Sequence, residues 1–327
     1  MNNYIHTVMH PEVYHEGWLK PPFFEGWYFK LVDKSLEHAY AIIPGAFRKV
    51  NREDSHAFIQ VLDGNSGKVR VFNFPYDALV VKTGSFDVSI GHNHFSRQGM
   101  TLDLEEEGFT LKGGLTFGEG QAWPVHWYSP GIMGFFGWIN LMECYHGLLS
   151  FDHAIDGFLD INGQMLDFSG GRGYIEKDWG KAFPHSWLWL QTNSFTHPGT
   201  SLSASVAIIP WLGMRFKGVI VGLWHAGKLY AFSTYNLVKV QKFELGEHHA
   251  SLHLQRGRFS LQIEAHKTGG GILEAPVPDG MDRRITESLM SSAHVVLKEH
   301  GKVIFEDTGV RAGMEIVGDI HLLMNMR

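Results

Sequence analysis

A strict alternation of apolar and polar residues is the feature that most constrains how this chain can fold. Four segments each contain two alternating runs of four to six residues, joined by a short turn of glycine, asparagine or other polar residues: LDLEEEGFTLKGGLTF (102–117), FLDINGQMLDF (158–168), SLHLQRGRFSLQIEA (251–265) and HVVLKEHGKVIFED (294–307). This period is typical of β-hairpins. No stretch keeps a helical period beyond about three turns. The alternation predicts an all-β chain with at most short helices, one of them near residues 281–290.

The chain also repeats itself. Ala-Ile-Ile-Pro occurs at 41–44 and again at 207–210, and three weaker matches follow in the same order: 58–74 with 219–234, 108–114 with 258–264, and 172–176 with 311–315. A preserved order of matches indicates an internal duplication. We expect one β-domain over residues 1–180, whose residues 1–16 form an extended N-terminal arm, and a second over 181–327.

Composition limits the classes of binding partner and the cellular compartment that we expect for this protein. The 327 residues have a formal net charge of −6 with the two signs interspersed, so no basic track exists for a nucleic acid. Cys144 is the single cysteine, which excludes intramolecular disulfides and fits a reducing compartment. The first residues do not resemble a secretory signal, and we expect a cytoplasmic protein. The apolar segment 131–142 is too short to span a bilayer; it favours a buried strand or loop and leaves open a transient contact with a membrane surface.

The segment GYIEKDWGKAFPHSWLWLQTN (173–193) joins the two predicted domains and has unusual chemistry. In its second half, alternate residues of a strand form one face: Trp187, Trp189, Gln191 and Asn193. Two indoles with two amides suit a wall that holds an apolar ligand and hydrogen-bonds its polar end. The alternative is an outer face on which the tryptophans cover a neighbouring loop.

In the first half of this segment, Tyr174, Glu176 and Asp178 share one strand face. Two carboxylates about 7 Å apart can divide into an ionised group and a protonated acid if their environments differ. A proton donor is therefore one interpretation. The other is that both carboxylates form salt bridges with neighbouring basic residues.

Two further acid–base candidates lie elsewhere. Glu25 is surrounded by aromatic residues in FFEGWYFKL (23–31), so it is either paired, with Lys30 or Lys177, or has a raised pKa. His146 could relay protons with Glu143, although a regular strand would place these two residues on opposite faces.

Other kinds of site find little support. The histidine pairs at 92–94 and 247–249 lie in turn-like contexts that favour solvated loops, and we expect no metal. Phosphate-binding loops, dinucleotide fingerprints and serine-nucleophile elbows are missing from the sequence, so no cofactor is expected. Cys144 is expected to be inert core, with a nucleophilic role beside His146 as the alternative.

Four strings together resemble the tocopherol cyclase family: FFEGWYFKL (23–31), SPGIMGFFGWINLMECYHGLLS (129–150), GYIEKDWGKAFPHSWLWLQTNSF (173–195) and AGMEIVG (312–318). The resemblance covers nearly the whole chain. It implies two lipocalin-like β-barrel or β-sandwich domains, in agreement with the duplication. It also implies a cofactor-independent cyclase that protonates a prenyl double bond on a quinol and traps the cation with the phenolic oxygen.

Such a reaction needs an acid, an aromatic cavity and groups that hold the quinol. Asp178 or Glu176 would be the acid, with Glu25 or His146 as alternates. The cavity and the quinol-holding groups would be Trp27, Trp179, Trp187 and Trp189, with Gln191, Asn193, Tyr28 and Lys30. The partner would be a hydrophobic small molecule. The alternatives are a non-catalytic carrier of an apolar ligand and a hydratase or pericyclase acting on another isoprenoid or polyketide.

Overall fold

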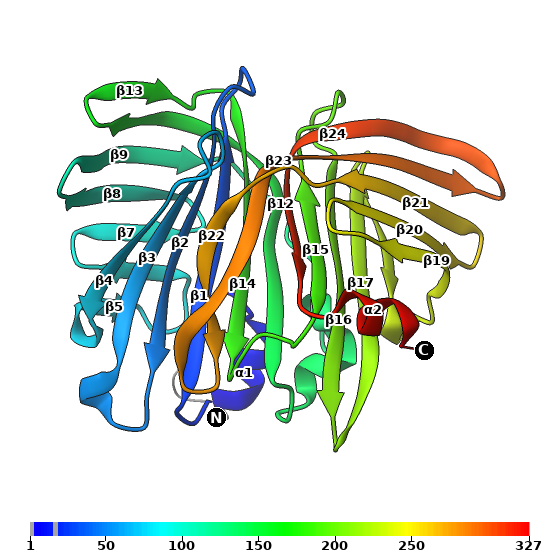
Figure 1. Cartoon of the computed structure of the whole chain (residues 1–327), viewed down its shortest axis with the longest axis horizontal. Helices are drawn as coiled ribbons and strands as arrows, with labels where there is room; N and C mark the ends of the chain where they lie inside the picture. The colour runs from blue at the N-terminus through cyan, green and yellow to red at the C-terminus, as the bar shows by residue number, and fades with distance from the viewer. Residues whose placement is uncertain (1–2, 16–18, 327) are drawn as a thin grey trace. The chain divides into compact units, whose positions relative to one another are not determined.

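The computed structural model describes residues 3–15 and 19–326, and nearly all of them belong to strands or the turns between strands (Figure 1). The helices α1 (Asn3–Met9) and α2 (Ile320–Asn325) are short. The predicted all-β class, with lipocalin-like β-units and at most short helices, is confirmed. None of the helices within the described residues is long and apolar enough to cross a membrane.

The chain divides into two compact units. Unit 1 comprises residues 1–63, 69–183 and 274–283, and unit 2 comprises 64–68, 184–273 and 284–327. The strands of unit 1 are β1 (Phe23–Val32), β2 (Ala39–Arg48), β3 (His56–Asp63), β4 (Val69–Pro75), β5 (Leu79–Val81), β6 (Asp87–Ile90), β7 (Asn93–Ser96), β8 (Gly99–Glu106), β9 (Phe109–Phe117), β10 (Val125–His126), β11 (Ser129–Pro130), β12 (Cys144–Ile161), β13 (Gln164–Asp167) and β14 (Gly171–Gly180).

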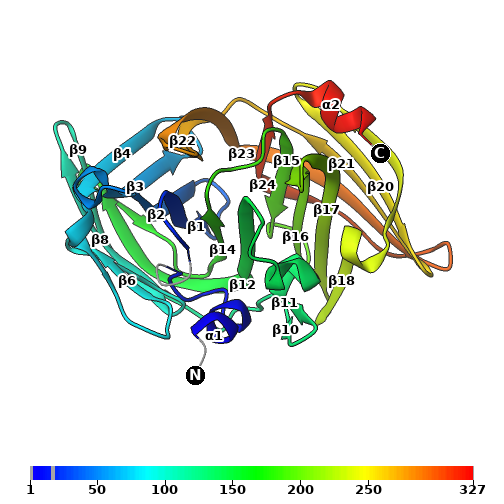
Figure 2. The ribbon, with the colours of Figure 1, turned by 90° about the horizontal axis from the view of Figure 1, so that it is seen from below.

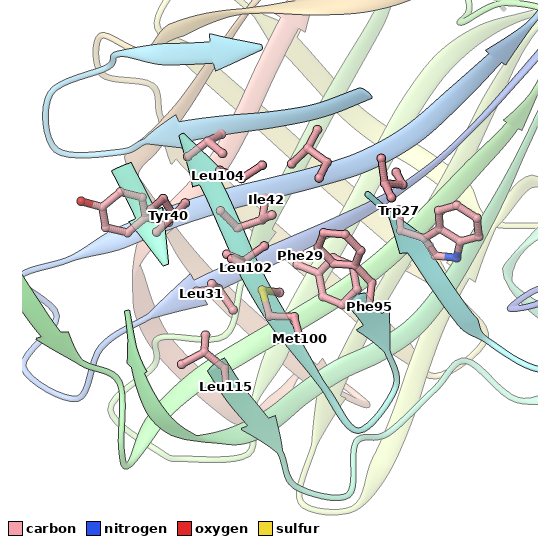
Figure 3. Packing of buried hydrophobic residues seen from close by; sticks show 14 of the residues in the cluster. Trp27, Phe29, Leu31, Tyr40, Ile42, Phe95, Met100, Leu102, Leu104 and Leu115 are labelled. Atoms are coloured by element: carbon pink, nitrogen blue, oxygen red, sulfur yellow. The ribbon is translucent and has the colours of Figure 1, made fainter. Parts of the chain in front are cut away.

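In unit 1 one antiparallel sheet runs in the order β4-β3-β2-β1-β14-β12-β9-β8-β7-β6-β5, with β13 paired to β12. Alternate residues of these strands point into a single apolar core, which Figure 3 shows around Phe29, Phe95 and Met100. The sheet curves strongly, because Phe72 on β4 packs against Phe109 on β9, with the ring centroids 6.1 Å apart. Every strand of this barrel-like sheet therefore has an inner, core-facing side and an outer side.

Unit 2 is built in the same way from β15 (Trp187–Thr192), β16 (Ser201–Trp211), β17 (Met214–His225), β18 (Lys228–Ser233), β19 (Lys239–Leu245), β20 (His249–Arg256), β21 (Phe259–His266), β22 (Gly271–Val277), β23 (Gly280–Glu299) and β24 (Lys302–Val317). Its sheet runs β18-β17-β16-β15-β24-β23-β21-β20-β19, with β22 paired to β23. Leu188 and Leu190 of β15 point into the core of this unit.

The repeated strings fall on strands with the same place in the two sheets. The Ala-Ile-Ile-Pro strings lie in β2 and β16, the second pair of matches spans β3–β4 and β17–β18, the third lies in β9 and β21, and the fourth in β14 and β24. This correspondence supports the proposal that the chain is a duplicated β-domain with copies over 1–180 and 181–327.

The boundaries of the compact units differ from a single domain boundary near residue 180 because a later segment of the chain returns to unit 1. Residues 274–283, the tip of the β22–β23 hairpin, belong to unit 1. The side-chain amide of Gln60 donates to the backbone carbonyl of Glu274 and accepts from its amide, both at 2.8 Å. Met281 packs with Phe24 and Phe47 in a small apolar cluster. This hairpin tip completes the outer side of the unit 1 sheet.

Three local expectations need correction. The helix expected near residues 281–290 is wrong, because these residues belong to the long strand β23, which pairs with β22 and, from Glu287 on, with β24. The N-terminal arm expected to be extended over residues 1–16 contains helix α1, while residues 1, 2 and 16 lie outside the described residues. The segment expected to be a buried strand or loop contains the 3-10 helix η3 (Gly131–Trp138), of which only the first half is buried.

Candidate functional site

The outer side of the unit 1 sheet carries a group of polar side chains that its registers bring together. Along β14, Tyr174, Glu176 and Asp178 alternate with core-facing residues. Strand β12 places His146 directly opposite Asp178, and β1 places Tyr28 opposite Glu176. Residues that oppose each other in antiparallel strands project to the same side. Four predicted site residues from three separate sequence motifs therefore meet here.

We call His146, Tyr174, Glu176 and Asp178 the histidine–carboxylate cluster. His146 Nδ1 lies 2.8 Å from Asp178 Oδ1, and His146 Nε2 lies 3.7 Å from Glu176 Oε2. The Tyr174 hydroxyl donates to Glu176 Oε2 at 2.5 Å. The side chain of Glu176 is 6% exposed, that of His146 14% and that of Asp178 24%. Asp178 is thus the member of the cluster most open to an incoming molecule.

The electrostatics of this cluster favour a bound proton. Burial by itself lowers the pKa of His146, but the adjacent carboxylates of Asp178 and Glu176 outweigh it and raise that pKa to about 9. At neutral pH the ring is an imidazolium whose two N–H groups face two carboxylates. The cluster can therefore hold a proton close to a partly exposed carboxyl group and reorganise it among three sites.

The same donor atoms could also attract a metal ion. One ligand atom each from His146, Glu176 and Asp178 lie within 4.8 Å of one another. A cation bound there would have to displace the proton that the two carboxylates stabilise on His146. We therefore interpret the group as a proton site, and the expectation of no metal and no cofactor stays a prediction.

Glu25 lies on the opposite, inner side of the sheet. It forms a buried ion pair with Lys177 and accepts hydrogen bonds from the backbone amide of His15 at 2.9 Å and from its ring, with Nδ1 2.9 Å from Oε1. Lys177 also donates to the backbone carbonyls of Val13 and Pro11. Burial raises the pKa of Glu25, but Lys177 and then His15 more than offset this, so the net shift is downward. Pairing with Lys177, one of the two expected partners, is what the structure has.

Trp27 and Trp179 belong to this inner arrangement rather than to the histidine–carboxylate cluster. Lys177 Nζ lies 4.9 Å from the ring centroid of Trp27 and 5.1 Å from that of Trp179. The ring of His15 stacks on Trp179, with the centroids 4.3 Å apart. The N-terminal segment and the two indoles together enclose the buried ion pair. Both tryptophans therefore stabilise unit 1 at a distance from the candidate acid.

Tyr28 and Lys30 lie on the same side of the sheet as the cluster. They oppose Glu176 and Tyr174 in the register of β1 with β14, and both are buried. The ring centroids of Tyr28 and Tyr174 are 6.5 Å apart in an edge-to-face arrangement. Two aromatic rings and an ammonium group thus lie on the same sheet face as the candidate acid, beside Glu176 and Tyr174. Neighbouring Cys144 carries a thiol whose pKa burial, Asp178 and Glu143 raise well above its ordinary value, which argues against a nucleophilic thiolate.

The remaining candidates belong to unit 2. Trp187, Trp189 and Gln191 lie on the face of β15 opposite to its core leucines, and Asn193 follows the end of the strand; all four are buried. Trp187 Nε1 donates to Glu315 Oε2 at 2.6 Å. Sequence reasoning missed Glu315 and also the role of Tyr174. The repeat could have found Glu315, because RAGME (311–315) matches RGYIE (172–176) and aligns Glu315 with Glu176.

A cavity of about 330 Å³ in unit 1 contains none of the predicted site residues. Its lining residues come from the β2–β3 connection, the start of β3, β4 and the β22–β23 hairpin tip: Lys49, His56, Asn73, Glu274, Gly280, Met281 and Asp282. Basic and acidic side chains share its wall. No predicted function is assigned to this cavity.

The fold and the cluster define an all-β protein of two lipocalin-like units, one of which carries a buried proton site on its outer sheet face. A family model described as tocopherol cyclase-like matches residues 125–318, more than half of the chain. The chain therefore belongs to the tocopherol cyclase-like family, and the resemblance seen in the sequence is confirmed. The matched region includes the histidine–carboxylate cluster and β15, but not β1.

Individual relatives are more distant. A rice (Oryza sativa subsp. japonica) protein named "probable tocopherol cyclase, chloroplastic" is 31% identical over 84 residues, which are 23% of this chain and 17% of that protein. The crystal structure of CghA with Sch210972 has a TM-score of 0.55 at 12% identity and covers 92% of this chain and 90% of its own. The structure of kievitone hydratase from Nectria haematococca has a TM-score of 0.50 at 11% identity, covering 90% and 89%. At these identities the likeness to the two solved structures is one of fold.

Proposed function

We propose that this protein is an enzyme, a cofactor-independent intramolecular cyclase that closes a ring on a prenylated quinol or a similar isoprenoid. The observation that carries the proposal is the protonated His146 held between Asp178 and Glu176. Membership of the tocopherol cyclase-like family supports it. A carrier of an apolar ligand has no need of a buried proton at a partly exposed carboxyl group. A cytoplasmic location and a peripheral contact with membranes stay part of this proposal.

In the proposed mechanism Asp178 is the acid, because it is the most exposed member of the cluster and is hydrogen-bonded to His146. The proton on His146 Nδ1 passes through the Asp178 carboxyl group to one carbon of the substrate double bond. This leaves a tertiary cation on the other carbon, a neutral His146 and the Asp178 carboxylate, whose charge stabilises the cation. The phenolic oxygen of the substrate then bonds to the cation, and its proton returns through Asp178 to His146. No oxidant, reductant or metal enters this balance.

The groups on the same sheet face as the acid suit this chemistry. Asp178 and Glu176 keep His146 protonated, and the Tyr174 hydroxyl donates to Glu176. The rings of Tyr28 and Tyr174 can face a cation, and Lys30 can bind a phenolic oxygen. Trp187, Trp189, Gln191 and Asn193 stay candidate substrate contacts of unit 2.

The test is to incubate the purified protein with a panel of prenyl quinols, without metal or nucleotide, and to look by mass spectrometry for a product of unchanged mass. Asp178→Asn should lower the rate by about 10²–10⁴-fold, the usual worth of a positioned acid, while substrate still binds. Asp156→Asn, a matched change at an exposed position of the same sheet, should leave the rate unchanged.

Each other outcome has a defined meaning. Recovery of bound but unchanged quinol from the wild-type protein would favour the carrier. A product heavier by one water would favour the hydratase, in which water replaces the phenolic oxygen as nucleophile. Full activity of Asp178→Asn would remove this residue from the mechanism.

A further inference from the structure

Unit 1 exposes a group of large apolar side chains in one place. The β10–β11 hairpin carries Trp127 and Tyr128 at its turn, 77% and 60% exposed, and the following segment exposes Phe135 and Leu141. Helix α1 lies near the β10–β11 hairpin (Figure 2). It packs against η3 and adds the exposed side chain of Ile5. We call these five side chains the aromatic patch. Single exposed apolar residues are ordinary, but a contiguous patch marks an interaction surface.

The segment that forms most of the aromatic patch has no formal charge. Not one Asp, Glu, Lys or Arg occurs from residue 120 to residue 142, between Glu119 and Glu143. In a chain whose charged residues make up 19%, this is a marked local depletion. A partner of the patch therefore gains little from charge pairing and must offer an apolar or neutral environment.

Internal hydrogen bonds tie the segments of the patch together. Trp138 Nε1 donates to the carbonyl of Trp127 at 2.8 Å and ties η3 to the hairpin. The Tyr4 hydroxyl donates to the carbonyl of Trp138, and the Tyr145 hydroxyl to that of Ile139 at 2.6 Å. Backbone groups that are already bonded can enter a medium of low polarity at small cost, and segments that are already tied together lose less entropy on binding.

We propose that the aromatic patch docks unit 1 onto the interfacial region of a lipid bilayer. Tryptophan and tyrosine favour this region because one end of each ring system is apolar and the other can hydrogen-bond. A hairpin turn with its two most exposed side chains at the tip is convex, so it fits a fluid headgroup layer without a preformed groove in a partner. Since the patch is uncharged, its affinity should depend on buried apolar area and little on anionic lipid or salt.

This inference does not rest on the proposed catalysis, and vesicle binding without substrate tests it alone. Wild-type protein should float with phosphatidylcholine vesicles in a density gradient. Trp127→Ser/Tyr128→Ser should lower the partition coefficient about tenfold or more, because each lost ring removes apolar area from the interface. Leu212→Ser/Met214→Ser is the matched control, since it removes two equally exposed apolar side chains from another hairpin turn, between β16 and β17. It should bind like the wild type.

The remaining outcomes overturn the proposal. If wild-type protein fails to bind protein-free vesicles, the patch serves a protein partner or none. If both double variants lose binding equally, the contact is not the aromatic patch. If binding needs phosphatidylglycerol and disappears in about 0.5 M NaCl, where charges are screened within a few ångströms, the contact is electrostatic. Unchanged circular-dichroism melting of both variants shows that folding is not the cause.

Discussion

Strands β14 and β24 occupy the same place in their two sheets, and they differ in the chemistry they carry. Each has a glutamate that accepts a hydrogen bond from an aromatic side chain: Glu176 from Tyr174, and Glu315 from Trp187. In unit 1 Asp178 follows and binds His146, whereas the repeat places Val317 at this position in unit 2. One copy thus keeps a proton site where the other has an apolar residue. Equivalent strands of the two units therefore share their place in the sheet but not their side-chain chemistry.

The inner sides of the two strands differ as well. Lys177 of β14 lies in a buried ion pair with Glu25, while the corresponding residue of β24 by the repeat is Ile316. Unit 1 therefore places charge on both sides of one strand. In unit 2, Ile316 packs against the apolar core at the corresponding place.

The same substitution made in β14 and in β24 tests most directly whether the two strands differ in function. Glu176→Gln should lower turnover of a prenyl quinol by about 10²–10⁴-fold, because the imidazolium loses one of its two stabilising charges. Glu315→Gln should stay within about threefold, since its expected role is to bind Trp187. Single-turnover rates of the two variants measure this. Equal losses would show that both copies take part in the chemistry.

The next largest effect concerns the buried ion pair. Lys177→Met should destabilise the fold by about 3–5 kcal/mol, because Glu25 remains buried and charged without its partner. Urea denaturation measures this difference. The double variant Lys177→Met/Glu25→Gln should recover most of the loss, while Lys181→Met at an exposed site should cost less than about 0.5 kcal/mol. A similar loss in the double variant would mean that packing, and not charge, is responsible.

Two histidines on β12 should have pKa values that are shifted in opposite directions from the ordinary value. The pKa of His146 is about 9, raised by Asp178 and Glu176 against burial, and burial lowers the pKa of His153 to about 4. NMR titration of the ring signals checks both values. His146 is more basic in the folded chain than its ordinary 6.5, so its contribution to stability is complete below that pH and is lost as the pH rises through 9.

The contribution from His146 is up to about 3 kcal/mol, and His146→Gln should flatten the alkaline side of the stability profile. His153 acts oppositely: the fold prefers its neutral form, so stability falls as the pH drops from 6.5 toward 4. An alkaline limb that is the same in wild type and His146→Gln would contradict the assignment.

The smallest effects come from the two aromatic donors. Tyr174→Phe and Trp187→Phe each remove one hydrogen bond to a glutamate and should cost about 1.5–3 kcal/mol in urea denaturation. Only Tyr174→Phe should also lower turnover, because only Glu176 adjoins the proposed acid. A rate loss in Trp187→Phe at unchanged substrate affinity would argue for chemistry in unit 2.

The fold was predictable because its signals are local. Alternation of apolar residues identifies the hairpins, and the repeated strings point to equivalent strands. The helix expected at 281–290 failed because pairing of β23 with β22 and with β24 overrides the local preference of a charged, poorly alternating stretch. The pattern of the stretch itself does not express the pairing with its neighbours.

The site could be predicted only in part. Alternation was enough to place Tyr174, Glu176 and Asp178 on one face. The partnership of Asp178 with His146 depends on the register between β14 and β12, which a bulge between Leu148 and Ser150 adjusts. The partnership of Glu25 with His15 depends on how the N-terminal segment folds back. Both are set by pairing between distant parts of the chain.

The β22–β23 hairpin tip has a consequence for anyone who wishes to work with half of this protein. Residues 274–283 complete unit 1, yet they are encoded after most of unit 2. A fragment that stops at residue 183 would lack Met281, which packs beside Phe24 and Phe47. It would also lack the backbone of Glu274, to which the side-chain amide of Gln60 is hydrogen-bonded. We expect such a fragment to aggregate when produced alone. Coexpression with the remainder of the chain, or a circular permutant that brings 274–283 next to residue 183, should restore it.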